Sequence, residues 1–203
     1  MNITRTLVSE HRLIEQVLNC LERMVERCAS QRRLESAPAR DAIVFFHGFT
    51  ERCHYAKEDT ELLPAMRATD ISPERCLGCS MLQRREEGRL HVDAMEAAIE
   101  PASRGDPTAL REFIEHARAY IELLLEYIAD QEDCLFPMIT RALSGPGKAR
   151  LEVAIDTVSG DGEEQYVCNT YIDLANRLAD HFDVPQAMTG DFPGSRRSKE
   201  SSE

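Results

Sequence analysis

The chain has 203 residues, which is enough for one domain with a hydrophobic core. Its formal net charge of −12 argues against nucleic acid or an anionic membrane surface as a major partner. No apolar stretch approaches the ~20 residues needed to span a bilayer, and the N-terminal segment lacks the apolar centre of a secretory signal. The seven cysteines are therefore expected to be reduced thiols, and the protein is expected to be cytoplasmic.

The hydrophobic pattern of the chain is helical from its beginning. Apolar residues recur at every third or fourth position from Leu7 to Cys28, which predicts one helix over residues 4–31. A polar segment at 35–40 interrupts this pattern, and a second helix is expected over residues 40–68.

Turn and cap signals divide the rest of the chain into further helices. A serine followed by a proline at 72–73 predicts the N-cap and first turn of a third helix. A loop at 101–107 separates it from a long fourth helix, which a Ser-Gly-Pro-Gly segment at 144–147 ends. Two shorter helices are expected after that, over residues 148–157 and 162–182.

Four long amphipathic helices with short connections predict an all-α, up-down-up-down four-helix bundle. We expect the bundle to occupy residues 1–145 and the extra short helices to form a C-terminal extension over 146–184. The composition of residues 185–203 is typical of a disordered tail.

Two segments of the chain are versions of each other. They are offset by 73 residues, which is the separation of His54 from Tyr127 and of Glu58 from Gln131. In the first segment, His54 and Glu58 are four positions apart, so a helix places them on one face. The second segment has Tyr127 and Gln131 at the same two places. The repeat therefore suggests a two-fold site of which one half has been rewritten.

Several polar residues fall where the helical pattern expects apolar ones. A bundle core admits such groups only if they are hydrogen-bonded, charge-paired or bound to metal. These residues are His11, Arg85, Tyr127 and Gln131. The second helix is less regular, because its clearest apolar residues lie on a different face from His54 and Glu58. Those apolar residues are Phe45, Phe49 and Cys53. The inward direction of His54 and Glu58 is therefore expected mainly from the repeat.

Together with His11 from a neighbouring helix, His54 and Glu58 supply two imidazoles and one carboxylate. That set suits a non-haem iron with open coordination positions. Taken singly, each residue has a plainer interpretation, as a core histidine or as a contact on a helix surface. His47 lies about 10 Å of helical rise from His54 and is expected to be a surface histidine.

The cysteines offer weaker signals. Cys76 and Cys79 form one C-x-x-C pair, but no second pair follows at the spacing of a zinc ribbon. Cys53 and Cys134 lie near the candidate site and are expected to fill the core as small apolar residues.

Four pieces of sequence carry a resemblance to a known family. They are Ser9-Glu10-His11-Arg12, Cys53-His54 with Lys57-Glu58-Asp59, Met81-Leu82 with Glu86-Glu87-Gly88-Arg89, and Tyr127-Ile128 with Leu135-Phe136-Pro137. Residues 4–145 thereby resemble the hemerythrin-like, His-His-Glu cation-binding proteins. The resemblance implies a four-helix bundle that holds two bridged irons, with ligands at His11, His54 and Glu58.

The chain departs from that family in its third and fourth helices. The resemblance implies a histidine at Arg85, a histidine at Tyr127 and an acid at Gln131, positions that serve chiefly the second iron and one bridge. An ordinary di-iron centre is therefore not expected. A guanidinium cannot ligate a metal, but it can stand where a cation stood and pair with Glu58. Alternatively, Tyr127 ligates one ferric ion as a phenolate and Arg85 lies outside.

Two functions remain open at this level. The first is a hemerythrin-like protein with one non-haem iron, or an altered centre, that senses or processes oxygen, peroxide or nitric oxide. The residues expected around the ion are His11, His54, Glu58 and Tyr127, with Arg85 and Gln131 beside them. The alternative is a metal-free structural or partner-binding module, in which Arg85 replaces an ion. Neither hypothesis decides whether the protein is an enzyme, or whether it binds a protein partner or forms a homo-oligomer.

Overall fold

The computed structural model describes residues 3–68, 78–142 and 162–187, and every regular element in these ranges is a helix. The predicted all-α class is therefore confirmed. The elements are α1 (Ile3–Gln31), α2 (Ser36–Phe45), η1 (Phe46–Tyr55), η2 (Glu58–Leu62), α3 (Leu63–Ala68), α4 (Gly78–Ser103), α5 (Pro107–Asp130), η3 (Gln131–Leu135), α6 (Phe136–Ala142) and α8 (Gly162–Phe182).

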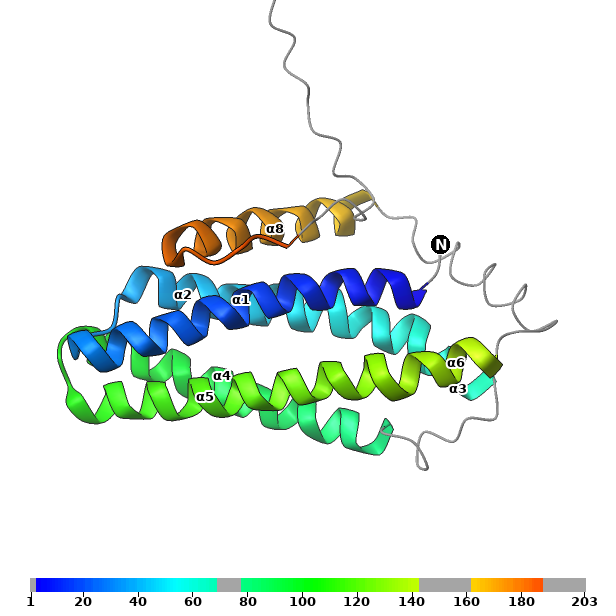
Figure 1. Cartoon of the computed structure of the whole chain (residues 1–203), viewed down its shortest axis with the longest axis horizontal. Coiled ribbons are helices and arrows are strands. Elements are labelled where there is room, and N and C mark those ends of the chain that lie inside the picture. Colours follow the sequence, from blue (N-terminus) through cyan, green and yellow to red (C-terminus); the bar gives the residue numbers. More distant parts are fainter. Residues whose placement is uncertain (1–2, 69–77, 143–161, 188–203) are drawn as a thin grey trace, which may run out of the picture.

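The helices lie side by side as a bundle with one additional helix (Figure 1). α4 and α5 form the most extensive helix pair, and α1 packs against α5 on one side and α8 on the other. α8 also lies along α2 and η1. α2, η1, η2 and α3 form one continuous rod. The middle of this rod therefore lies between the bundle interior and α8.

The residues at the ends of the helices explain where the bundle turns. α1 ends before Arg32, whose φ of 53° is the left-handed conformation common after a helix C-terminus. α5 begins at Pro107, and the side chain of Asp106 accepts hydrogen bonds from the backbone N–H groups of Thr108 and Ala109. α4 continues to Ser103, so the loop expected at 101–107 is shorter than predicted.

The predicted second helix is one continuous rod, but two of its segments, η1 and η2, are π-helical. A π turn closes on the fifth residue rather than the fourth, so it rotates the following side chains relative to an α-helix. This rotation buries Phe45 and Phe49 together with His54 and Glu58, although a regular helix would place these pairs on different faces. The inward direction expected for His54 and Glu58 is confirmed.

The 73-residue repeat has a structural counterpart. η2 and η3 occupy the same place in the two copies, and each is followed by an apolar residue and a proline, Leu63-Pro64 and Phe136-Pro137. A proline lacks an N–H and its ring crowds the carbonyl of the preceding turn, so a wider turn before it relieves both problems. The same wide turn corrects one prediction. Cys134 is exposed rather than buried, because η3 shifts the following residues around the helix.

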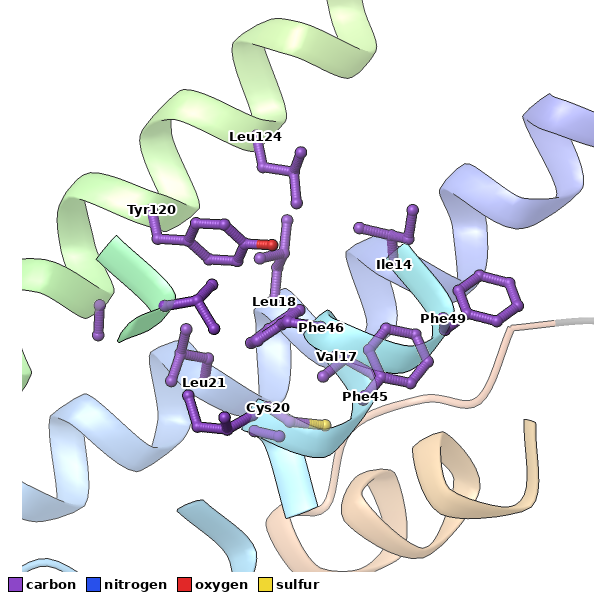
Figure 2. Packing of buried hydrophobic residues seen from close by; sticks show 14 of the residues in the cluster. Ile14, Val17, Leu18, Cys20, Leu21, Phe45, Phe46, Phe49, Tyr120 and Leu124 are labelled. Carbon is purple, nitrogen blue, oxygen red and sulfur yellow. The ribbon is translucent and has the colours of Figure 1, made fainter. Parts of the chain in front are cut away.

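The apolar side chains of the four-helix bundle form one continuous core. One part of it lies between α1, α2, η1 and α5, where Phe45, Phe46 and Phe49 pack beside Leu18 and Tyr120 (Figure 2). α8 adds its own buried residues to the same core. They are Leu174, Ala175, Leu178, Ala179 and Phe182.

The cysteines differ from the expectation. Cys53 and Cys168 form a disulfide between η1 and α8, with their Cα atoms 6.4 Å apart. The prediction that all cysteines are reduced, and that Cys53 is a free core residue, is therefore wrong. The sequence pattern could not bring together two residues that are 115 positions apart. Cys20 and Cys28 are buried free thiols.

Some expectations fall on residues outside the described ranges. They include the helix start at 72–73, the helix over 148–157, Cys76, the side chain of Cys79 and the tail from residue 188 onward. The division at residues 145 and 184 stays a prediction. Among the helices in the described part of the chain, none combines the length and apolarity needed to cross a membrane.

Candidate metal centre

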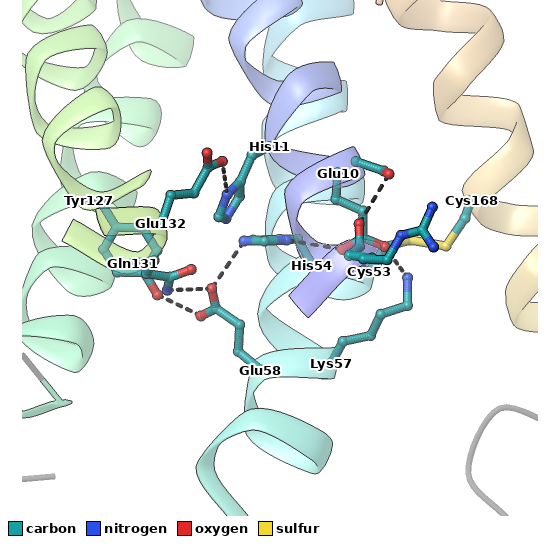
Figure 3. A network of polar contacts seen from close by, with 12 residues as sticks. Glu10, His11, Cys53, His54, Lys57, Glu58, Tyr127, Gln131, Glu132 and Cys168 are labelled. Atoms are coloured by element: carbon teal, nitrogen blue, oxygen red, sulfur yellow. Dashed lines mark hydrogen bonds and ion pairs between the residues drawn. A yellow bond between two sulfur atoms is a disulfide. The ribbon is translucent and has the colours of Figure 1, made fainter. Parts of the chain in front are cut away.

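The three residues predicted as ligands converge in the bundle interior. His11 comes from α1, His54 from η1 and Glu58 from η2, and each is at most 1% exposed. One ligand atom from each lies within 4.8 Å of the others, so a single ion can reach all three. Figure 3 shows both imidazoles directed toward the Glu58 carboxylate.

The Nδ1 atom of each histidine is hydrogen-bonded to a carboxylate. Nδ1 of His11 lies 2.8 Å from Oε1 of Glu132, and Nδ1 of His54 lies 3.0 Å from Oε2 of Glu10. A carboxylate partner places the proton on Nδ1 and leaves a lone pair on Nε2, which is the usual arrangement of a metal-bound histidine. Both Nε2 atoms are buried and have no hydrogen-bond partner among the described residues. These two nitrogen atoms are the clearest candidates for binding a metal ion in the centre.

The two supporting carboxylates are tied to basic side chains nearer the surface. Lys57 donates to Oε1 of Glu10. Arg12 donates to Oε2 of Glu132 over 2.5 Å. The hydrogen bond from His11, with Arg12 beside it, lowers the pKa of Glu132, so this carboxylate is ionised and accepts the Nδ1 proton.

Sequence reasoning missed Glu10 and Glu132 as parts of the centre. A signal for Glu10 was present, because it falls in a heptad series with Leu7, Ile14 and Val17, all of which are buried. Glu132 gave no comparable signal, because the π turn that orients it is not visible in a helical pattern.

The carboxylate of Glu58 is surrounded by donors from α4, α5 and η3. The hydroxyl of Tyr127 donates to Oε2 over 2.5 Å, and the amide of Gln131 donates to Oε1 over 2.7 Å. Arg85 also donates to Oε2 through Nη2. All three positions that depart from the family pattern therefore bind Glu58.

Arg85 is fixed by more than this ion pair. Its Nη1 donates to Asp59 over 2.7 Å, and its Nε donates to the Tyr127 hydroxyl over 3.2 Å. The guanidinium lies over the ring of Tyr55, 4.6 Å from the centroid. With 4% exposure, Arg85 is a buried cation inside the bundle, where the repeat predicted the second half of the site.

Burial and charge act in opposite directions on the titratable groups. Burial lowers the pKa of His11. Burial would also lower the pKa of His54, but the carboxylates of Glu58 and Glu10 outweigh it and raise that pKa to about 9. For Glu58, burial is outweighed by His54 and Arg85, which lower its pKa to about 2. Glu58 is therefore an anion in the metal-free protein.

Tyr127 is held as a neutral phenol. Burial, reinforced by the Glu58 carboxylate, raises its pKa well above 10. Its oxygen already donates to Glu58 and accepts from Arg85. In this arrangement Tyr127 shapes the centre as a hydrogen-bond donor.

His54 and Glu58 are close without being hydrogen-bonded. Nε2 of His54 and Oε1 of Glu58 are 3.0 Å apart, yet Nε2 has no partner with hydrogen-bond geometry. With a pKa of about 9, His54 is protonated in the metal-free protein, and a bound cation would take the place of the Nε2 proton between the imidazole and Glu58. The residues present therefore suit one ion at His11, His54 and Glu58, whereas the guanidinium of Arg85 occupies the side of Glu58 where a second ion would need ligands.

A groove of about 550 Å³ runs along the surface between the start of α1 and α6. Glu132 and Phe136 line its inner wall. The ring of Phe136 stacks on His11, with centroids 5.7 Å apart and an interplanar angle of 9°. Phe136 thus lies between the groove and His11.

A second set of potential ligands lies near the surface, away from this centre. It consists of His47, Asp93 and Glu96. His47 is half-buried rather than fully exposed, and the two acids are exposed. Their side chains are 3.6–3.7 Å from the imidazole, as in an ordinary solvated ion-pair cluster.

The comparison with known families finds one match, to the family described as hemerythrin HHE cation binding domain, over residues 2–139. The match covers more than half of the chain and contains every residue of the metal centre. It ends before α8. No curated protein and no solved structure matches the chain.

Proposed function

The chain belongs to the hemerythrin HHE cation-binding family. From this premise we propose that it holds one non-haem iron ion, in a smaller version of that family's two-ion centre. The ligands would be His11, His54 and Glu58. The observation that carries the proposal is the pair of buried Nε2 atoms that lack a hydrogen-bond partner among the described residues, each with its Nδ1 on a carboxylate.

Two histidines and one carboxylate leave several coordination positions of an iron ion open to an exogenous ligand. A bound ion would supply Lewis acidity and access to a second oxidation state. The protein would orient both imidazoles through Glu10 and Glu132, and it would hold Glu58 as an anion through Tyr127 and Gln131. Ligation by a Tyr127 phenolate stays an alternative, although the raised pKa of this phenol and its hydrogen bond to Glu58 both oppose it.

The exogenous ligand would be dioxygen, peroxide or nitric oxide, bound for sensing or for turnover in the cytoplasm. The small size of these molecules agrees with the burial of the centre and with the position of Phe136 between His11 and the surface groove. An anionic macromolecule is a poor candidate partner for a protein with a net charge of −12.

A second candidate is a metal-free structural or partner-binding module. The observation in its favour is that Glu58 is fully satisfied by Arg85, Tyr127 and Gln131 without an ion. In that case a proton on His54 and the charge of Arg85 balance the buried carboxylates. A protein partner or a second copy of the chain would then be the ligand that matters.

Metal content decides between the two candidates. The purified wild type should contain about one equivalent of iron per chain, and His54→Ala should lose it. His47→Ala is the matched control, because it removes a histidine from the same rod outside the centre. Iron in the wild type and in His47→Ala, but not in His54→Ala, supports the proposed centre. An iron-free wild type that stays iron-free after reconstitution with ferrous salt supports the metal-free module.

A further inference from the structure

The helix α8 lies outside the matched family segment and is tied by a covalent bond to the rod that carries His54 and Glu58. Cys53 directly precedes His54 in η1, and Cys168 lies in the N-terminal half of α8. The disulfide between them is drawn beside His54 and Glu10 in Figure 3. Any change in this bond therefore acts on the segment that positions a ligand.

The two halves of α8 are held in different ways. The C-terminal half is anchored by the buried core residues named above and by Arg27, which donates to the His181 carbonyl and lies over the Phe182 ring. The N-terminal half is joined to η1 by the disulfide. It also places the half-buried Tyr171 over Gly48, where a Cβ atom would lie 2.1 Å from the ring. Opening the disulfide would thus free one end of the helix while the other stays docked.

We propose that the Cys53–Cys168 disulfide is a redox latch that holds η1, and with it His54, in its ligand-bearing conformation. An external dithiol donates two electrons and two protons to the S–S bond. The products are the Cys53 and Cys168 thiols and the disulfide of the reductant. The regulatory part of this inference rests on the proposed iron centre, whereas the latch itself does not.

The route from the latch to the ligand is short. η1 is π-helical, a conformation that is rare and needs support from its surroundings. His54, which lies in η1, is aligned by the Glu10 carboxylate on α1. Glu10 also accepts a hydrogen bond from Lys57, which lies on the same rod as His54. Release of Cys53 removes the outer support of η1, so the alignment of His54 with Glu10 loosens and the centre holds its ion less firmly.

The chemistry of the other described cysteines leaves this pair as the responsive one. Cys20 and Cys28 are buried, and burial raises their thiol pKa values to about 12 and about 11. Cys134 is exposed but has no partner cysteine within the described residues. In a reducing compartment, a protein disulfide is usually a transient or redox-sensing one.

Hydrogen exchange on the full-length, metal-free protein tests the latch by itself. Amide exchange across η1 should be at least tenfold faster in wild type reduced with dithiothreitol than in oxidised wild type. Exchange in α4 and α5 should not change and serves as the internal reference. Cys168→Ser should exchange fast in η1 under both conditions. Cys134→Ser, the matched control, should behave as the wild type does. Equal η1 exchange in oxidised and reduced wild type would overturn the latch, as would alkylation of both cysteines without reductant.

A second arm tests the coupling to the ion. Iron-loaded protein is mixed with a chelator, and the ion should leave at least tenfold faster after reduction in the wild type. Cys168→Ser should release it fast in either state. Equal release rates with changed η1 exchange would overturn the coupling and leave the latch. If the protein binds no iron, the proposed function fails, and the hydrogen exchange alone decides the latch.

Discussion

The guanidinium of Arg85 lies against the carboxylate of Glu58, and the two side chains are only 4% and 0% exposed. The cation and the anion come from different helices, α4 and η2. Removing one partner of such a pair leaves an uncompensated charge in the core, whereas removing both can leave stability unchanged. Arg85 therefore supplies, together with His54, the positive charge that balances Glu58.

Arg85→Met should destabilise the metal-free protein by about 3–5 kcal/mol, because it strands the Glu58 carboxylate in the core. Equilibrium denaturation measures the loss. The double variant Arg85→Met/Glu58→Leu should recover much of it. Arg84→Met is the matched control on the same helix. Its partner Asp130 is exposed, so the expected cost is about 1 kcal/mol or less. A cost for Arg85→Met as small as that of the control would show that Arg85 does not balance Glu58.

Restoring the family residues should restore the missing half of the site. In the triple variant Arg85→His/Tyr127→His/Gln131→Glu, the guanidinium, the phenol and the amide that surround Glu58 are replaced by two imidazoles and a carboxylate. The iron content should rise from about one to about two equivalents per chain, with the ultraviolet bands of a bridged pair. Iron that stays at one equivalent in a folded triple variant would show that more than these three positions separates the chain from a di-iron centre.

Tyr127→Phe tests the role of the phenol. It removes a hydrogen bond to the buried Glu58 carboxylate and keeps the ring, so the expected loss of stability is about 1.5–3 kcal/mol. If Tyr127 is a donor, the ferric wild type has no phenolate charge-transfer band, and the variant has an unchanged spectrum. A visible band in the wild type that disappears in Tyr127→Phe would instead establish Tyr127 as a ligand.

Much of the centre could be predicted from the sequence because helical periodicity and the repeat are local signals. In α4, Arg85 is buried as predicted, in line with the buried apolar residues Met81, Val92, Met95 and Ile99. The helical pattern wrongly predicted that Cys134 is buried, and it did not by itself predict the inward direction of His54. Both failures have one physical reason. A π turn changes the number of residues per turn, so a pattern read at 3.6 residues per turn loses its phase beyond it.

The remaining features depend on contacts between distant parts of the chain. The carboxylate Glu132 reaches His11 across 121 positions, and Cys168 reaches Cys53 across 115. No periodicity within one helix records such pairs. Only the docking of η3 on α1, and of α8 on η1, brings them together.

Gly48→Ala should disturb the contact between η1 and α8. The added methyl group would meet the ring of Tyr171, which must rotate away and give up its packing. The expected cost is about 1–3 kcal/mol in equilibrium denaturation. Tyr171→Ala removes the same contact, so the double variant should cost little more than the larger single effect. Fully additive losses would mean that the ring and Gly48 do not pack together.

Thiol reactivity should follow burial and disulfide pairing. Cys134 is exposed, so iodoacetamide should label it in the native, oxidised protein at pH 8. Cys20 should resist, because a thiol with a pKa of about 12 is a thiolate at pH 8 in only about one molecule in ten thousand. The thiolate fraction of a raised-pKa thiol grows tenfold per pH unit, so labelling of Cys20 should increase with pH and not with reductant.

Cys53 should show the opposite behaviour and become labelled only after reduction. Peptide mass spectrometry assigns each label, and rapid labelling of Cys20 at pH 8 in folded protein would contradict its burial.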